Sequence, residues 1–91
     1  MTLNELLERI RLEQGTLSAA QQQVAAYVVE NYYQIPFLSI SALAAAIGVS
    51  DNTIVKFCVR FGFDKFAQFK NILIWALMFL SGQMDLLVTM I

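Results

Sequence analysis

The sequence comprises 91 residues with a formal net charge of -1; its hydrophobic share of 58% is above the usual range, whereas its charged share of 14% is below it. A single small domain of this length buries only about two-thirds of its unfolded surface, so we expect a second chain to cover some of the apolar remainder. The sequence contains no histidine and one cysteine, and its acidic residues do not pair with a nucleophile at catalytic spacing, so we expect no enzymatic activity, metal or cofactor.

The first segment, residues 1–14, is predicted to form an amphipathic helix. Acidic side chains are spread through it, which argues against a secretory signal. Four apolar residues at helical spacing form one stripe: Leu3, Leu6, Leu7 and Ile10. Such a short helix is stable only when packed, and its neighbour is either its own domain or a second subunit.

The second predicted helix begins after Ser18, which stands in capping-box spacing with Gln21, and runs to about Asn31. Its buried stripe is Ala20, Val24, Tyr27 and Val28. Pro36 then disfavours helical geometry at the residue before it. We expect the aromatic side chains around this proline to cover the helix junction, because the stretch lacks the basic neighbours of a base-stacking platform. They are Tyr32, Tyr33 and Phe37.

Residues 39–63 are predicted to form two short helices joined by a tight turn. Ser39 is placed to cap the first helix, Gly48 to end it in the left-handed conformation, and Ser50 to cap the second. The buried stripe of the first helix is Ile40, Leu43, Ala44 and Ile47. Two helices around a short turn that contains glycine indicate a helix-turn-helix.

The second helix of this motif has two chemically different sides. At about 100° per residue, one arc collects the apolar residues Ile54, Phe57, Cys58 and Phe61. The opposite side collects Asn52, Thr53, Lys56, Val59 and Arg60. An amide, a hydroxyl and two cations suit phosphates and base edges. An ordinary solvated helix face is the alternative, but the preceding helix and glycine turn favour DNA binding.

The charges are unevenly distributed along the chain. Residues 1–47 hold two arginines and four glutamates, whereas residues 48–71 hold four cations and two aspartates. The positive part therefore coincides with the helix-turn-helix. Four cations are a modest electrostatic footprint, so we expect useful affinity for DNA only when two copies bind together.

The C-terminal stretch from residue 72 onward is apolar on all sides, and a helix of this kind must be covered on all sides. Three interpretations remain open: a dimer-forming helix, a membrane segment, and an aggregation-prone artefact of truncation. The stretch has the length of a membrane span, but Ser81-Gly82-Gln83 interrupts it and Asp85 would lie in hydrocarbon. We expect the Ser81-Gly82 break to end one helix and to let a short helix, residues 84–90, fold back. The expected dimer contacts are Leu3, Leu7, Ile74, Trp75, Met78, Phe79, Leu86 and Leu87.

From Leu17 to Lys70 the sequence closely resembles the N-terminal domain of the RpiR family of bacterial transcriptional regulators. Several motifs carry the resemblance in order: Leu17-Ser18, Glu30-Asn31, the stretch from Ser39 to Ser50, then Thr53, Val55, Lys56, Phe57, Cys58, Gly62 and Phe63, and the following Phe66, Phe69 and Lys70. The resemblance implies an all-α, homeodomain-like or winged-helix-like domain, a compact bundle of about five helices, that dimerises on operator DNA. It also implies a bacterial, cytoplasmic protein.

The family usually joins this domain to a C-terminal sugar isomerase domain, which we do not expect within these 91 residues. Residues 1–80 are interpreted as the DNA-binding domain and residues 81–91 as an apolar extension at the dimer interface. The chain is then either a domain cut from a longer regulator or a naturally short form, and no sugar-phosphate site is assigned to it.

These observations predict a homodimer that places the helix Asp51–Phe61 of each copy in successive major grooves, about 34 Å apart. The predicted DNA contacts are Ser50 and Thr53 to phosphates or base edges, Asn52 to a base, Lys56 and Arg60 to guanine or phosphate, and Lys65 and Lys70 to backbone phosphates. Asp51 is expected to serve the helix dipole. The alternatives are a protein interaction module that uses the apolar tail, and a membrane-associated truncated regulator.

Overall fold

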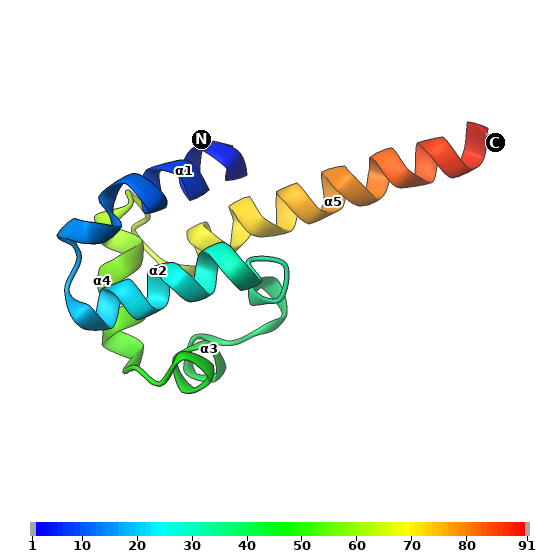
Figure 1. Cartoon of the computed structure of the whole chain (residues 1–91). Coiled ribbons are helices and arrows are strands. Elements are labelled where there is room, and N and C mark those ends of the chain that lie inside the picture. Colours follow the sequence, from blue (N-terminus) through cyan, green and yellow to red (C-terminus); the bar gives the residue numbers. More distant parts are fainter. Residues whose placement is uncertain (1, 91) are drawn as a thin grey trace.

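The computed structural model describes the backbone of residues 2–90 and the side chains of residues 2–78, and it is helical, with no strand in that part of the chain. In chain order the elements are α1 (Leu3–Glu13), the 3-10 helix η1 (Gln14–Thr16), α2 (Ala19–Asn31), the 3-10 helix η2 (Ile35–Phe37), α3 (Ile40–Ile47), α4 (Asp51–Arg60) and α5 (Phe66–Met90). The predicted all-α fold with a helix-turn-helix, formed by α3 and α4, is confirmed (Figure 1).

The predicted helix starts are formed by side-chain caps. The hydroxyl oxygens of Ser18, Ser39 and Ser50 each accept a hydrogen bond from the backbone N–H three residues later, at 3.3, 3.1 and 3.2 Å. Thr2 caps α1 in the same way, at 3.2 Å. Each cap satisfies a backbone donor that has no partner within its helix, which fixes where the helix begins.

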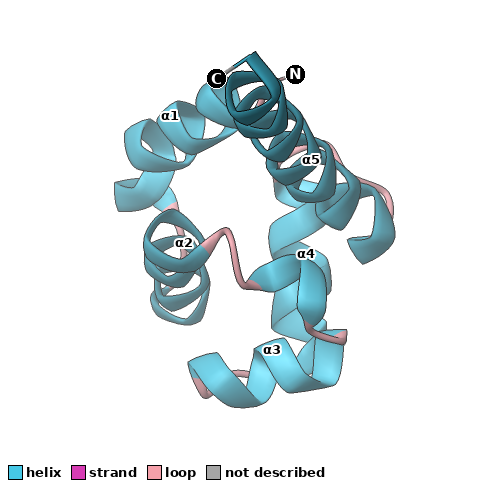
Figure 2. Ribbon diagram, turned by 90° about the vertical axis from the view of Figure 1, so that its right-hand side faces the viewer, coloured by secondary structure: helices cyan, strands magenta, loops and turns pink. Residues whose placement is uncertain are grey.

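The turn between α3 and α4 depends on Gly48. Its φ of 89° lies in the left-handed region, and its N–H donates to the carbonyl of Ala44 at 2.8 Å. The N–H of Val49 donates to the same carbonyl at 3.0 Å. Only three residues therefore separate α3 from α4, and the angle between the two helices is 100°. Figure 2 shows α3 lying across the end of α4 at one edge of the bundle.

One hydrophobic core joins the helices. The largest fully buried side chains include Phe57 of α4, Phe61 at the C-cap of α4, and Phe69 of α5. The ring centroids of Phe57 and Phe61 are 4.8 Å apart, and those of Phe57 and Phe69 are 6.3 Å apart in an edge-to-face arrangement. The aliphatic members of the core come from all five helices and the turns: Leu6, Leu7, Ile10, Leu17, Val24, Val28, Ile35, Leu43, Ile54 and Leu73.

The fold-back of the C-terminal stretch was predicted wrongly. Instead of ending near Ser81-Gly82, α5 is one helix from Phe66 to Met90, and it projects from the bundle as a long arm (Figure 1). A single helical glycine costs only about 1 kcal/mol relative to alanine, and strong helix formers flank it here. Without a proline to stop it, the helix continues.

The predicted aromatic cover over the junction after α2 is formed only in part. Tyr32 packs against the core and meets Tyr33 edge-on at 5.8 Å between centroids. Phe37, however, is 83% exposed. The 3-10 helix η2 turns Ile35 inward, to 0% exposure, and a residue two positions later in so tight a helix points elsewhere.

Among the described residues, no one helix has both the length and the apolar character of a membrane span. The helices α3 and α4 reach those limits only in combination, and they are bent by 100° relative to each other.

Replacing Gly48 by alanine should destabilise the fold by about 1–2 kcal/mol, because an L-residue is strained at a positive φ. A Cβ atom at this position would meet nothing within 4 Å, so the cost is conformational and not steric. The matched control is Gly15→Ala, where a Cβ also meets nothing within 4 Å and φ is not positive. Urea denaturation measures both variants, and equal stability of the two would contradict the prediction.

Candidate nucleic-acid interface

The outward face of α4 is a narrow stripe of four side chains. At about 100° per residue, Val55, Lys56 and Val59 all fall within about 60° of Asn52 around the helix axis. All four side chains are exposed, Val55 by 39% and Val59 by 58%. The predicted buried arc lies opposite, and each of its members is 1% exposed: Ile54, Phe57, Cys58 and Phe61. The core thus fixes which side of α4 faces a partner.

The N-terminal end of α4 is tied together by short polar contacts. The hydroxyls of Ser50 and Thr53 are 2.9 Å apart, in addition to the cap between them. Ser41 of α3 donates to the carboxylate of Asp51 at 2.9 Å. This bond joins the two helices of the motif and holds the carboxylate near the positive end of the α4 dipole. Ser41 was not among the residues predicted from the sequence, because it is the second residue of α3 and lies ten positions before Asp51, so no local spacing shows that the two meet.

Arg60 is not part of the outward stripe. Its guanidinium donates to the hydroxyl of Thr16 at 2.7 Å and to the carboxylate of Glu13 at 3.5 Å. The same carboxylate accepts from Arg9 at 2.7 Å, and Arg9 also lies over the ring of Phe61, 5.4 Å from its centroid. Arg60 therefore fastens the end of α4 to α1 and η1, a role that the sequence prediction did not include.

The carboxylate of Glu13 is the centre of this polar cluster. The hydrogen bond from Arg9 and the positive charges of Arg9 and Arg60 hold the pKa of Glu13 below its ordinary value of 4.5, against the opposing effect of partial desolvation. Two guanidinium groups favour the ionised carboxylate because it accepts from both. The cluster is thus fully formed at neutral pH.

The other predicted phosphate-binding lysines have different environments. Lys70 donates to the carbonyl of Leu38 at 2.9 Å, and its ammonium lies 5.3 Å from the ring centroid of Phe66. It therefore ties the start of α5 to the segment after η2. Lys65, just before α5, is exposed. Within the part of the chain that the structure describes, Lys56 and Lys65 are the cations with no hydrogen bond or ion pair.

The predicted dimer contacts fall into three environments. Trp75 and Met78 of α5 are 72% and 62% exposed. Ile74 and Leu3 are partly buried, whereas Leu7 is 7% exposed and belongs to the chain's own core. The side chains of three further predicted contacts lie outside the described residues: Phe79, Leu86 and Leu87. Among the predicted dimer contacts whose side chains are described, the exposed ones thus lie on α5.

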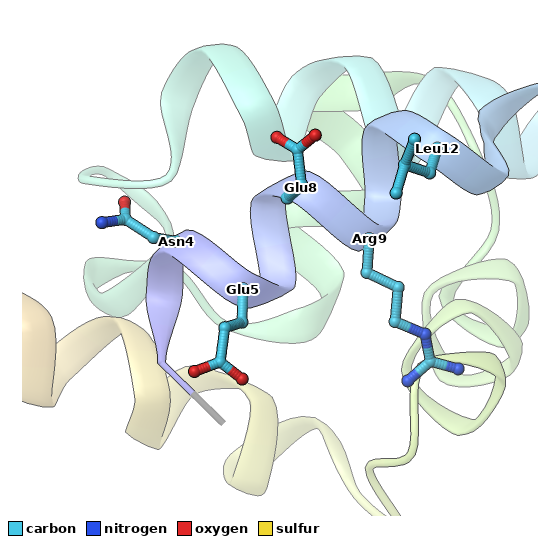
Figure 3. A pocket seen from close by; sticks show the side chains of 5 residues that line it. All are labelled: Asn4, Glu5, Glu8, Arg9 and Leu12. Atoms are coloured by element: carbon cyan, nitrogen blue, oxygen red, sulfur yellow. The ribbon is translucent and has the colours of Figure 1, made fainter.

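A shallow depression of about 510 Å³ lies over α1. Its lining comes from α1 alone, and Figure 3 shows the side chains spreading in different directions. The lining residues are Asn4, Glu5, Glu8, Arg9 and Leu12. Side chains that diverge do not form a ligand site, so the outward face of α4 remains the candidate site.

Cys58 faces the core, and burial raises the pKa of its thiol to about 12. The thiolate, the reactive form, is therefore negligible at neutral pH. The predicted role as a small core residue agrees with this position. Across the described residues, no group of histidine, cysteine, aspartate or glutamate side chains could hold a metal ion.

Comparison with known proteins identifies relatives of most of the chain. The family described as "Helix-turn-helix domain, rpiR family" matches residues 4–78. The HTH-type transcriptional regulator HexR of Pseudomonas aeruginosa is 35% identical over 68 residues, which cover 75% of this chain and 24% of HexR. The chain thus spans about a quarter of the length of this relative.

The free energy of unfolding should decrease at acidic pH, because the carboxylate of Glu13 becomes protonated. Because its pKa is lowered on folding, the unfolded chain takes up the proton first as the pH falls, so the stabilisation present at neutral pH is lost below about pH 4.5. Glu13→Gln should lower stability at neutral pH and flatten this part of the profile. Urea midpoints at about pH 7 and about pH 3.5 measure the effect. Glu30→Gln, outside the cluster, is the control, and identical profiles for both variants would contradict the prediction.

Proposed function

This chain belongs to the rpiR family of helix-turn-helix domains, and on that basis we propose that it binds operator DNA in a sequence-specific manner, as a homodimer, through the outward face of α4. The family makes it a DNA-binding domain of a transcriptional regulator. The operator, the homodimer and the residues in contact are the finer parts of the proposal.

The exposed stripe of α4 is the observation that carries the proposal. The core holds the opposite face of the helix, and the caps and the Ser41–Asp51 bond hold its N-terminal end. Asn52 and Lys56 stand on the exposed face with no partner among the described side chains. An amide that can pair with adenine and a cation that can reach guanine or phosphate are the groups that a major-groove helix presents.

Phosphate contacts would position this helix on the duplex. Ser50 and Thr53 lie at the N-terminal end of α4, where backbone N–H groups and the helix dipole favour a phosphate. Lys65 is exposed just before α5 and supplies a second, purely electrostatic contact. Arg60 and Lys70, in contrast, act through the fold, because both are held by groups of the chain itself.

A second copy would cover the exposed face of α5. Trp75 and Met78 are three residues apart and lie on one side of the helix, where they leave an aromatic and a thioether side chain in water. Two such helices packed together would bury this apolar surface and set the spacing of two α4 helices, about 34 Å for successive major grooves.

A protein interaction module is the second candidate function. The same exposed Trp75 and Met78 favour it, since large apolar side chains that gather on a surface mark contacts with other proteins. In that case α3 and α4 would be scaffold, and the partner would be a different protein. Oligomeric state and DNA binding distinguish the two candidates.

Lys56→Ala should abolish discrimination between an operator and unrelated DNA, or weaken it by at least tenfold, because the base-facing cation is lost. Lys65→Ala should instead weaken binding to all duplexes alike and reduce the slope of log affinity against log salt by about one unit. Fluorescence anisotropy across a salt series measures both variants. Unchanged operator binding by a folded Lys56→Ala variant would contradict the proposed interface.

Trp75→Ala with Met78→Ala should shift the chain from dimer to monomer, since the two side chains are the exposed large apolar ones in the described part of α5. Light scattering and sedimentation measure the mass in solution. Leu12→Ala removes a side chain of similar exposure, 77%, from α1 and should leave the mass unchanged. A wild-type monomer at tens of micromolar would contradict the shared-helix dimer.

A further inference from the structure

The outward stripe of α4 contains two valines, which are not among the DNA contacts predicted from the sequence. Val55 and Val59 are 39% and 58% exposed, although valine is usually buried. They are four residues apart, so they stand one above the other on one side of the helix. Asn52 and Lys56 lie beside them on the same stripe. An apolar ridge thus runs along the face that is proposed to enter the major groove.

Two polar side chains of α4 that could contact bases in place of the valines, Arg60 and Thr53, do not lie on the outward stripe. Arg60 lies about 80° around the axis from Asn52 and is bound to Thr16 at 2.7 Å. Thr53 is partly buried, and its hydroxyl is 2.9 Å from that of Ser50. The readout face therefore offers one amide, one lysine and two branched apolar side chains, but no arginine fork for guanine.

We propose that Val55 and Val59 are specificity-determining residues that contact the 5-methyl groups of thymines, so that each half-site has A·T pairs under this ridge. The inference rests on the proposed function, since it assigns chemistry to the same helix face. In the major groove the thymine methyl is the apolar feature of the base edges, and it pairs with small apolar side chains. Asn52, beside the valines, is suited to the amino group and N7 of adenine.

The spacing along the helix agrees with this assignment. Four residues correspond to about 6 Å along the axis, and base pairs are stacked about 3.4 Å apart. The two valines therefore match methyl groups on base pairs one or two steps apart. From Asn52 to Val59 the stripe covers about 10 Å, or three base-pair steps.

Thymine replaced by deoxyuridine tests the inference directly, because this change removes only the methyl group. The 91-residue chain is first used to select binding duplexes from a randomised pool, and each dT of the selected site is then replaced by dU. We expect about fourfold weaker binding at one or two positions in each half-site, as for the loss of one buried methyl. Anisotropy titration at fixed salt measures the change.

Alanine variants of the two valines test whether these side chains contact the thymine methyl groups. Val59→Ala and Val55→Ala should each bind the thymine duplex about fourfold more weakly and lose the effect of dU at one position. Alanine is the stronger helix former, so both variants should fold, which circular dichroism checks. Leu12→Ala, an exposed apolar side chain of α1, should keep the full effect of dU.

The outcomes separate the inference from the function on which it rests. Duplex binding that depends on Lys56 but is insensitive to dU at every position would overturn the valine assignment and leave the proposed function intact. A dU effect that persists unchanged in both valine variants would also overturn it. Absence of duplex binding by the folded wild-type chain would overturn both.

Discussion

The packing of one face of α4 against the core is the constraint on which the rest of the structure depends. Phe57 contacts Phe61, the C-cap residue of α4, and Phe69 on α5, with centroid distances of 4.8 and 6.3 Å, and all three rings are 1% exposed. A helix anchored by large rings cannot rotate about its axis without opening the core. The core therefore determines which side chains of α4 face outward. The left-handed turn at Gly48 is a second constraint, since it fixes the angle between α3 and α4.

Features that depend on neighbours in the sequence could be predicted from the sequence. The caps at Ser18, Ser39 and Ser50 involve residues three apart, and the left-handed residue had to be a glycine. The buried stripes follow from the helical period, which is why the arc from Ile54 to Phe61 was placed correctly. The resemblance to the rpiR family depends on the same short motifs, and the family match over residues 4–78 confirms it.

Roles that depend on distant residues could not be predicted in this way. Arg60 and Thr16 are 44 positions apart, and Lys70 and Leu38 are 32 positions apart, so no local spacing shows that they meet. An arginine on a helix in a basic region has the same pattern whether it binds DNA or its own chain. The continuation of α5 past Gly82 has another cause: a turn signal of about 1 kcal/mol is too weak to end a long helix of good helix formers.

Most of the cations contact groups of the chain itself, so few of them are free to contact DNA at the proposed interface. Of six lysines and arginines, Arg9, Arg11 and Arg60 are within 4 Å of carboxylates and Lys70 is bound to a carbonyl, which leaves Lys56 and Lys65 without such a partner among the described residues. Each neutralised phosphate contributes about 0.9 to the salt slope, so the sequence-independent attraction of one copy would be weak. The small number of free cations would lower the affinity for non-specific DNA most, because that affinity comes from contacts between cations and phosphates. In the proposed function, a base-contacting stripe on each of two linked copies would be the means by which so weakly charged a domain binds its site and still releases unrelated DNA.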